Sequence, residues 1–308
     1  MKKTECFKIQ LLQFDSASDI FDLSQGLPIL RIGCGGPIYS PNPVHIEADP
    51  FLFVKDDILY LFYEHKLQRN KGVLNMLFTK DLKKWSKPVT VLEEPYHLSF
   101  PWVFEEDGHV YMIPETGADN CIRLYEATNF ELTDFKFVKE LLHTPSDVSV
   151  SMGYGDSCIY KKNGKYYLLT QLQYEDHINT LELYVSDGLM CEFHPHPCSP
   201  IQHNQKTGRN AGSLMEYNGK LLRFSQDCTN RYGDNVHISQ ITRITPSDYE
   251  EKLIKENIIP TEIPFYREGG HQLNVVQFKG KWSVATDAQE YNRLLFSRII
   301  YKILKFFR

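Results

Sequence analysis

Polar side chains recur at two fixed distances from five turn sequences. The turns begin at Asp56, Asp107, Asn163, Asn218 and Lys279. Seven residues before the turns stand Asp49, Phe100, Asp156, Ala211 and Gln272, and eight residues after them stand Glu64, Glu115, Gln171, Gln226 and Asp287. Structurally neutral repeats are expected to keep one residue type at equivalent positions, whereas these positions differ. We interpret the difference as a polar site that several copies of one repeat build together.

Three of these carboxylates are the predicted catalytic residues. Asp49 and Asp156 each lead into an expected strand, and Glu115 follows Pro114. Two or three carboxylates around one pocket permit glycosidic chemistry, because one can act as base or nucleophile while another donates a proton or shifts the pKa of its neighbour. The alternative is that polar residues beside turns only solvate the ends of strands.

Further polar residues near the aligned positions are the predicted substrate ligands. They are Glu64, Lys71, His97, Arg209, Gln226, Asp227, Tyr232 and His271. Arg209 is the preferred anion ligand, because a guanidinium binds phosphate or carboxylate through two hydrogen bonds. The alternative for each basic residue is a solvated surface role. His194, His196 and His203 lack the spacing of zinc ligands, so we expect no metal and no other cofactor.

The turns also predict the fold, because each joins two short apolar-aromatic strands, as at 51–53 and 59–63. Five such units, each about four strands long, indicate an all-β protein and, more finely, a five-bladed β-propeller. Neighbouring blades in such a ring bury each other's faces. The alternative is a β-sandwich with coincidental hairpins. We expect the propeller over 1–291, with blades near 46–95, 96–150, 151–205, 206–265 and 266–291, the last completed by an N-terminal strand.

The segment 292–308 has no counterpart among the repeats. Its basic side chains fall three or four residues apart, at Arg298, Lys302 and Lys305, and its apolar side chains fall on another stripe. This pattern predicts a basic amphipathic helix that binds a membrane surface. The alternative is a helix that docks on the propeller or pairs with another chain.

Composition limits the cellular setting and the partners. The formal net charge of −5 gives no basic field for a phosphate backbone, so we expect no nucleic-acid binding. Seven cysteines without a C-x-x-C pair suggest reduced thiols. The sequence has no long apolar run, so we expect neither a signal peptide nor a transmembrane helix. We therefore expect a cytoplasmic protein, peripheral on the inner face of a membrane.

Several motifs together resemble a known family. They are ADPFLF (48–53), YHLSFPWVF (96–104), YMIPET (111–116), RNAG (209–212), and QDC (226–228) followed by YG (232–233). They are similar to the propeller domain at the N-terminus of plant glucosamine inositolphosphorylceramide transferases and of bacterial proteins of cell-surface polysaccharide synthesis. The similarity covers about 45–290. The plant proteins carry a separate glycosyltransferase domain after the propeller, for which these 308 residues leave no room.

A more distant resemblance is to the five-bladed glycoside hydrolases of family 43. In that family an Asp-Pro in the first blade supplies the base, a later Asp tunes pKa values, and a Glu is the acid. The resemblance implies that Asp49 is the base and that Asp156 is the tuning residue. Asn210 and its neighbours occupy the place where the acid would lead into blade four, and Glu115 is the possible substitute.

These features favour a glycosyltransferase-like enzyme of cell-surface polysaccharide or glycolipid biosynthesis. Its partners would be an activated sugar donor, a glycan or glycolipid acceptor, and a membrane surface. In this hypothesis Asp49 deprotonates the acceptor hydroxyl, while Arg209, His97 and His271 hold the anionic donor. One alternative is a glycoside hydrolase or phosphorylase with rearranged acids. The other is a carbohydrate-binding propeller without catalysis that positions a partner glycosyltransferase.

Overall fold

The computed structural model describes residues 3–15, 19–33, 45–67, 70–144, 146 and 149–293. These residues are mostly in strands, so the all-β prediction is confirmed. The strands are β1 (Lys3–Phe14), β2 (Leu27–Ile32), β3 (His45–Lys55), β4 (Ile58–Leu67), β5 (Val73–Thr79), β6 (Val89–Leu92), β7 (Ser99–Glu106), β8 (His109–Glu115), β9 (Cys121–Ala127), β10 (Phe135–His143), β11 (Val150–Lys162), β12 (Lys165–Tyr174), β13 (Asn179–Ser186), β14 (His194–Pro195), β15 (Gln202–His203), β16 (Met215–Tyr217), β17 (Lys220–Asp227), β18 (Asn235–Ile244), β19 (Tyr249–Lys255), β20 (Leu273–Phe278) and β21 (Lys281–Arg293). Short 3-10 helices are η1 (Leu23–Gln25), η2 (Gly117–Asp119) and η3 (Pro264–Tyr266).

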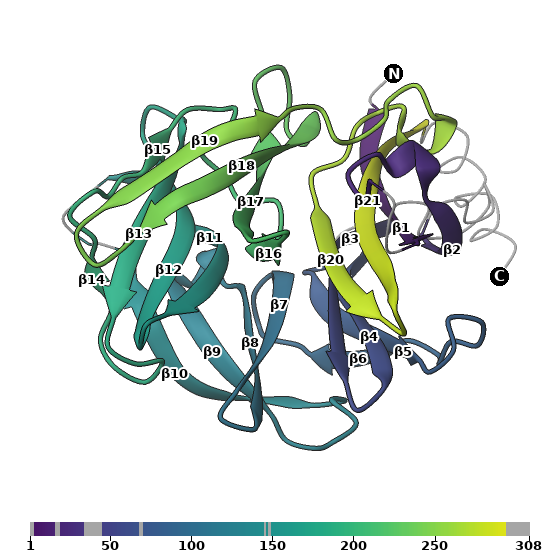
Figure 1. Cartoon of the computed structure of the whole chain (residues 1–308), viewed down its shortest axis with the longest axis horizontal. Coiled ribbons are helices and arrows are strands. Elements are labelled where there is room, and N and C mark those ends of the chain that lie inside the picture. The colour runs from purple at the N-terminus through teal and green to yellow at the C-terminus, as the bar shows by residue number, and fades with distance from the viewer. Residues whose placement is uncertain are drawn as a thin grey trace, which may run out of the picture.

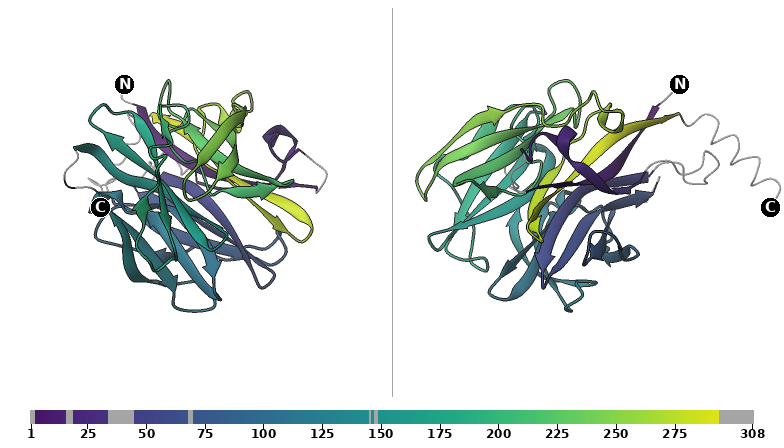
Figure 2. Two further views of the ribbon diagram at one scale, coloured as in Figure 1. Left: turned by 60° about the vertical axis from the view of Figure 1, so that its left-hand side comes forward. Right: turned by 45° about the vertical axis from the view of Figure 1, so that its right-hand side comes forward.

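The strands form groups that surround a central axis (Figures 1 and 2). One sheet runs β20-β21-β1-β3-β4-β5-β6, with β2 beside β1, and one parallel residue pair, Phe7 with Ile46, joins its two halves. The other sheets run β10-β9-β8-β7, β11-β12-β13-β14 with β15 beside β13, and β16-β17-β18-β19. The arrangement is propeller-like, with β3, β7, β11, β16 and β20 next to the axis (Figure 1).

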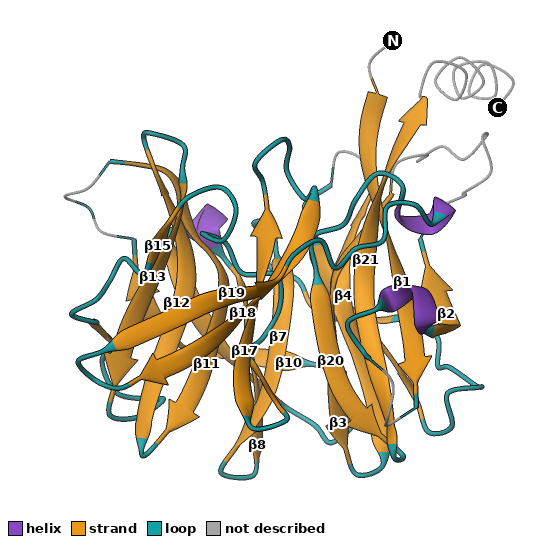
Figure 3. Ribbon diagram, turned by 45° about the horizontal axis from the view of Figure 1, so that its top comes forward, coloured by secondary structure: helices purple, strands orange, loops and turns teal. Residues whose placement is uncertain are grey.

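The five hairpin turns share one backbone conformation and lie on the same face of the protein (Figure 3). Asp107 and Gly108, for example, have φ angles of 50° and 80°, and the other four turns also begin with two left-handed residues. Two such residues make the tight hairpin turn whose twist matches that of the strands, and Asp, Asn and Gly tolerate it. The turns lie on one face, at the bottom of Figure 3. The polar positions, at the other ends of the strands, therefore meet on the opposite face.

Strand β1 joins the beginning of the described chain to its end. It pairs antiparallel with β21 without a break, from Lys3 opposite Arg293 to Phe14 opposite Trp282. A helix was expected over 292–308. Its first two residues, Asn292 and Arg293, belong instead to β21. Residues 294–308 lie outside the described residues. Within the described part of the chain, no helix is long and apolar enough to cross a bilayer.

Aromatic side chains hold neighbouring strand groups together. Phe51 of β3 and Phe100 of β7 are fully buried and pack edge to face, with ring centroids 4.7 Å apart. Burial of one such side chain contributes about 1.5–3 kcal/mol. These contacts fix β3 against β7 beside the axis, so the polar residues on these strands keep a constant spacing.

Candidate active site

A repeated backbone irregularity turns two predicted catalytic side chains toward the axis. Asp49, Phe100 and Asp156 have φ angles of 51°, 46° and 49°, and the strand register shifts beside each of them. A β-bulge of this kind inserts one residue and re-aims its side chain. A left-handed conformation costs about 1–2 kcal/mol for a residue with a side chain, although Asp bears it more easily than Phe. The contacts described next offset that cost.

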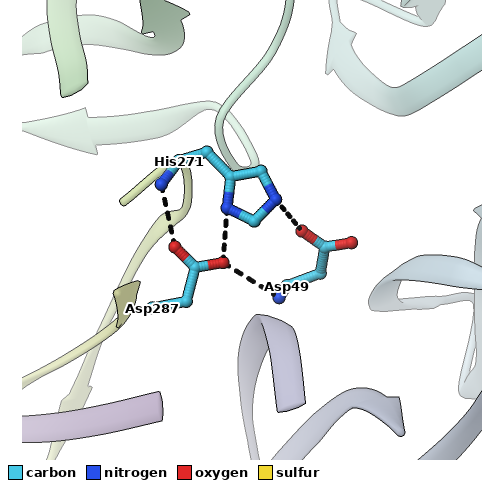
Figure 4. Close-up of side chains that lie close together, drawn as sticks. All are labelled: Asp49, His271 and Asp287. Atoms are coloured by element: carbon cyan, nitrogen blue, oxygen red, sulfur yellow. Dashed lines mark hydrogen bonds and ion pairs between the residues drawn. The ribbon is translucent and has the colours of Figure 1, made fainter. Parts of the chain in front are cut away.

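Asp49, His271 and Asp287 form one buried network (Figure 4). His271 Nδ1 lies 2.6 Å from Asp287 Oδ2, and His271 Nε2 lies 3.4 Å from Asp49 Oδ1. The backbone N–H of Asp49 donates to Asp287 Oδ2 over 3.3 Å, and the N–H of Phe100 donates to Asp49 Oδ2 over 3.1 Å. Both oxygens of Asp49 therefore have a fixed partner.

Asp156 is the centre of a second network. Arg209 Nε donates to Asp156 Oδ2, and Gln226 Nε2 donates to the same oxygen over 2.9 Å. Asn210 Nδ2 donates to the Asp156 carbonyl over 2.8 Å. The guanidinium carbon of Arg209 also lies 5.2 Å from the centroid of the Tyr232 ring, within cation–π range. The positive charge of Arg209 is therefore committed to groups of the protein.

Glu115 approaches this network from β8. Its Oε2 lies 3.6 Å from Arg209 Nη2, and it is a buried atom without a hydrogen-bond partner among the described residues. Gln171 Oε1 is likewise buried and unpaired, while Gln171 Nε2 donates to Asn179 Oδ1 over 3.3 Å. A Cβ at Gly155 would stand 2.7 Å from Glu115 Oε2 and 3.1 Å from Gln171 Oε1. The absence of a side chain at Gly155 therefore lets Glu115 Oε2 and Gln171 Oε1 lie directly against the backbone of β11.

Glu64 pairs with His97 at the edge of the site. His97 Nε2 lies 3.5 Å from Glu64 Oε1, and His97 Nδ1 accepts a hydrogen bond of 2.8 Å from the N–H of Gly72. Because a backbone N–H can only donate, Nδ1 carries no proton and Nε2 carries it. Burial lowers the pKa of His97 to about 4, and it raises the pKa of Glu64 well above its usual value. His97 is therefore uncharged at neutral pH, and burial favours the protonated form of Glu64.

The remaining protonation states are set by burial and by nearby charges. Burial raises the pKa of Asp49 to about 6, with His271 opposing the rise and Asp156 adding to it. Burial and the charge of Asp156 raise the pKa of Glu115 to about 8. Burial lowers the pKa of His271, but Asp287 and Asp49 outweigh it and bring the value to about 9. At neutral pH Asp49 is thus mostly ionised, while Glu115 and His271 are mostly protonated.

Buried and partly exposed side chains both belong to the cluster. Asp49, Asp156 and Asp287 are at most 5% exposed. The Glu115 side chain is 17% exposed, that of His97 33%, and Tyr232 is 41% exposed. The last three residues therefore mark the mouth of the site, and Tyr232 offers a ring face against which a sugar can stack.

Two predicted ligands point elsewhere. Lys71 donates to the carbonyl of Glu94 and forms an ion pair of 3.3 Å with Glu93. Asp227 Oδ2 lies 3.1 Å from Nε2 of the buried His237. Asp227 follows Gln226 on β17, and successive side chains of a strand point to opposite faces, so only Gln226 reaches Asp156.

One group of residues has the composition of a cation site. Suitable atoms of Asp49, His271 and Asp287 all lie within 4.8 Å of one another. Asp287 already accepts backbone N–H groups on both oxygens, and His271 is mostly protonated at neutral pH and has no lone pair to offer. We therefore describe the group as an ion-pair network and not as a set of metal ligands.

The structure adds three residues to the predicted site. Asp287, Gln171 and Asn210 belong to the cluster, although the sequence argument did not select them as catalytic residues or ligands. All three occupy or adjoin the aligned positions, so the repeat alignment carried the signal. What it lacked was the pairing of Asp287 with His271, which depends on the loop before β20.

Solved structures with this fold define the class. A putative glycosidase of Bacteroides thetaiotaomicron has a TM-score of 0.58 at 13% identity, over 79% of this chain and 87% of that one. The family 117 glycoside hydrolase Zg3597 of Zobellia galactanivorans has a TM-score of 0.56 at 11% identity, over 83% of this chain and 88% of that one. GH43B of the Bacteroides ovatus xyloglucan locus has a TM-score of 0.55 at 16% identity, over 77% of this chain and 48% of that one. The chain thus has the propeller-like fold of glycoside hydrolase structures.

The chain belongs to the family of the N-terminal domain of glucosamine inositolphosphorylceramide transferase 1, whose model matches residues 22–287. The Arabidopsis thaliana transferase is 32% identical over 257 residues, which are 78% of this chain and 30% of that protein. The transferase of Oryza sativa subsp. japonica is 32% identical over 234 residues, 73% and 30% of the two chains. The resemblance predicted from the motifs is confirmed. The chain spans about 30% of the length of these curated relatives.

Proposed function

We propose that the protein is a sugar-transferring enzyme of glycolipid or cell-surface polysaccharide biosynthesis, with its chemistry at Asp49, Glu115 and Asp156. The observation that carries the proposal is one buried cluster in which Asp49 has a pKa of about 6 and Glu115 a pKa of about 8. A pair of carboxyl groups whose environments separate their pKa values has the properties of a base and an acid. The names of the relatives support a sugar and a glycolipid as substrates.

The roles follow from the protonation states. Ionised Asp49 takes the proton of the acceptor hydroxyl, and protonated Glu115 donates a proton to the oxygen of the leaving group. Asp156 faces both carboxyls, and its charge favours the protonated form of Glu115. Arg209 balances the charge of Asp156 and keeps it in place.

The donor is bound differently from the way the sequence suggests. Arg209 and His271 are both buried and already paired with carboxylates, and His97 is uncharged at neutral pH. We therefore propose that the three residues orient the carboxyl groups, and that the activated donor binds at the mouth, with its sugar and its leaving group beside the partly exposed Glu115 and Tyr232.

A second candidate function is glycoside hydrolysis or phosphorolysis. Protonated Glu115 favours it, because the departure of a sugar alcohol depends on protonation more strongly than the departure of a phosphate does. A carbohydrate-binding module is the third candidate, since the same polar cluster can hold a sugar without turnover.

The transfer assay separates these candidates. Purified protein is incubated with a panel of nucleotide sugars and inositolphosphorylceramide, and the products are analysed by mass spectrometry. We expect a glycosylated lipid, and we expect Asp49→Asn to lower the rate at least about a hundredfold. His237→Gln, which breaks a buried Asp–His pair outside the cluster, is the matched control. Full activity of Asp49→Asn would overturn the proposal, free sugar from a synthetic glycoside would favour hydrolysis, and binding without turnover would favour the module.

The finer architecture and the location are also proposals. We infer five blades, made of β3–β6, β7–β10, β11–β15, β16–β19, and β20, β21, β1 and β2. Support comes from the antiparallel pairing within each group and from the single parallel pair between β1 and β3.

We also propose that 294–308 forms a basic amphipathic helix that holds the protein on the inner face of a membrane, in the cytoplasm. Sedimentation with anionic vesicles tests this. Ile299→Glu should abolish binding, and binding equal to that of the wild type would contradict the proposal.

A further inference from the structure

Asp287 is a fully buried carboxylate that contacts the protein on every side. Its Oδ1 accepts the N–H of His271 over 2.8 Å and the N–H of Gln272 over 3.1 Å. Its Oδ2 accepts the N–H of Asp49 and lies 2.6 Å from His271 Nδ1 (Figure 4). It is 0% exposed, so any influence on a substrate must pass through its neighbours.

His271 is held between two carboxylates. Its Nδ1 faces Asp287 and its Nε2 faces Asp49 Oδ1 over 3.4 Å. The Phe7 ring lies with its centroid 4.6 Å from that of the imidazole, and the Tyr232 ring lies 5.1 Å away. The ring is 3% exposed, so packing prevents it from turning away from either carboxylate.

The backbone is shaped for this contact. A Cβ at Gly270 would stand 2.3 Å from the carbonyl oxygen of Asp287, so only glycine lets the loop lie directly on β21. Gly233 has a φ of 66°, and a Cβ there would stand 3.2 Å from His271 Cβ. Two glycines therefore allow the close approach of His271 to Asp287 and of the Tyr232 loop to His271.

We propose that Asp287 is a positioning residue that acts through His271 to hold the Asp49 carboxylate in one orientation and in its charged form. The inference rests on the proposed role of Asp49 as base. An imidazolium between two carboxylates stabilises the negative charge of both, and in a buried site this effect is stronger than in water. The N–H of Phe100 holds the second oxygen of Asp49, which fixes the direction of its lone pairs.

The direction of the effect follows from the charges. Without the charge of Asp287, the pKa of His271 falls, because burial is then opposed chiefly by Asp49. A neutral His271 no longer lowers the pKa of Asp49, which therefore rises. The direct effect of removing the Asp287 charge is to lower the pKa of Asp49. This direct effect is smaller, because His271 influences the pKa of Asp49 more than Asp287 does. The other titratable groups that face this pair are Glu64, Glu115, Asp156, Arg209 and Tyr232.

The first test needs no enzymatic activity. NMR titration of the full chain follows the ring nitrogens of His271 and the side-chain carboxyl carbon of Asp49, assigned with His271→Gln and Asp49→Asn. In Asp287→Asn, which keeps the shape of the side chain, we expect the His271 midpoint to fall and the Asp49 midpoint to rise, each by about one pH unit or more. Unchanged midpoints would overturn the inference. His237→Gln is the control and should leave both midpoints unchanged.

The second test uses the transfer reaction. In Asp287→Asn the acidic limb of the kcat/KM profile should move up by about one pH unit, which is about a fivefold loss relative to the wild type at pH 6 and little loss at pH 8. His271→Gln should move it in the same direction. An equal loss at every pH would indicate a structural role and would contradict positioning. A shift seen by NMR in a protein without turnover would leave this inference standing while refuting the proposed function.

Discussion

Replacement of Glu115 by Gln should stabilise the protein in alkaline solution. Burial raises the pKa of Glu115 from 4.5 to about 8, so the folded protein holds this proton more tightly than the unfolded chain. Its contribution to stability is fully present below about pH 4.5 and is lost as the pH rises through 8. Gln imitates the protonated acid at every pH and therefore does not lose this contribution.

The expected difference in the free energy of unfolding follows from the size of the pKa shift, from 4.5 to about 8. The upper limit is about 5 kcal/mol, because each unit of pKa shift corresponds to about 1.4 kcal/mol. Glu115 is 17% exposed and solvent screens part of this effect, so we expect about 2 kcal/mol at pH 9. At pH 5 the wild type and Glu115→Gln should have nearly equal free energies of unfolding.

Urea unfolding at pH 5, 7 and 9, followed by tryptophan fluorescence, measures the difference. Titratable groups that do not face Glu115 contribute equally to both proteins and cancel in the comparison. Equal m-values establish that the same surface is exposed on unfolding. If the difference between the two proteins stays constant from pH 5 to 9, the buried protonated state of Glu115 is refuted.

Three further changes probe the same cluster. Arg209→Gln leaves Asp156 buried without its cation and should lower the free energy of unfolding by about 3 kcal/mol. The double variant Arg209→Gln/Asp156→Asn should restore part of this loss. A double variant no more stable than Arg209→Gln would contradict the ion pair. Gly155→Ala should weaken binding of the transferred sugar about tenfold, because its Cβ would stand 2.7 Å from Glu115 Oε2 and would displace that side chain; an unchanged Kd from calorimetry would contradict a role of Glu115 in binding the sugar. Tyr232→Ala should also weaken binding about tenfold and Tyr232→Phe much less, whereas equal losses would assign the effect to the hydroxyl and not to stacking.

The strand pairs were predictable because their signals are local. Asp107-Gly108 and Asn163-Gly164 require a left-handed backbone, and this requirement by itself selects a tight hairpin between the flanking apolar runs. Repetition then placed equivalent strands around one axis. An N-terminal strand was expected to complete the last group of strands, but the register in which β1 pairs with β21 depends on a contact between distant parts of the chain, which no local pattern contains.

The site was predictable only where the repeat placed it. Asp49, Glu115 and Asp156 meet because equivalent strand ends converge on the axis. Lys71 and Asp227 were chosen for their chemical type, and the alternation of side chains along a strand or the path of a loop sends them elsewhere. Shifts in pKa depend on burial, which the order of residues does not reveal.

The pairing of β1 with β21 has a consequence for biosynthesis. β1 is translated before the other described strands, and its partner begins only at Lys281. At about 5–20 residues per second, β1 waits roughly 15–50 s for that partner. During this time an apolar strand has a free edge that other chains can join. The interval makes the nascent chain a substrate for chaperones, and slow codons between β20 and β21 should lower the yield of folded protein.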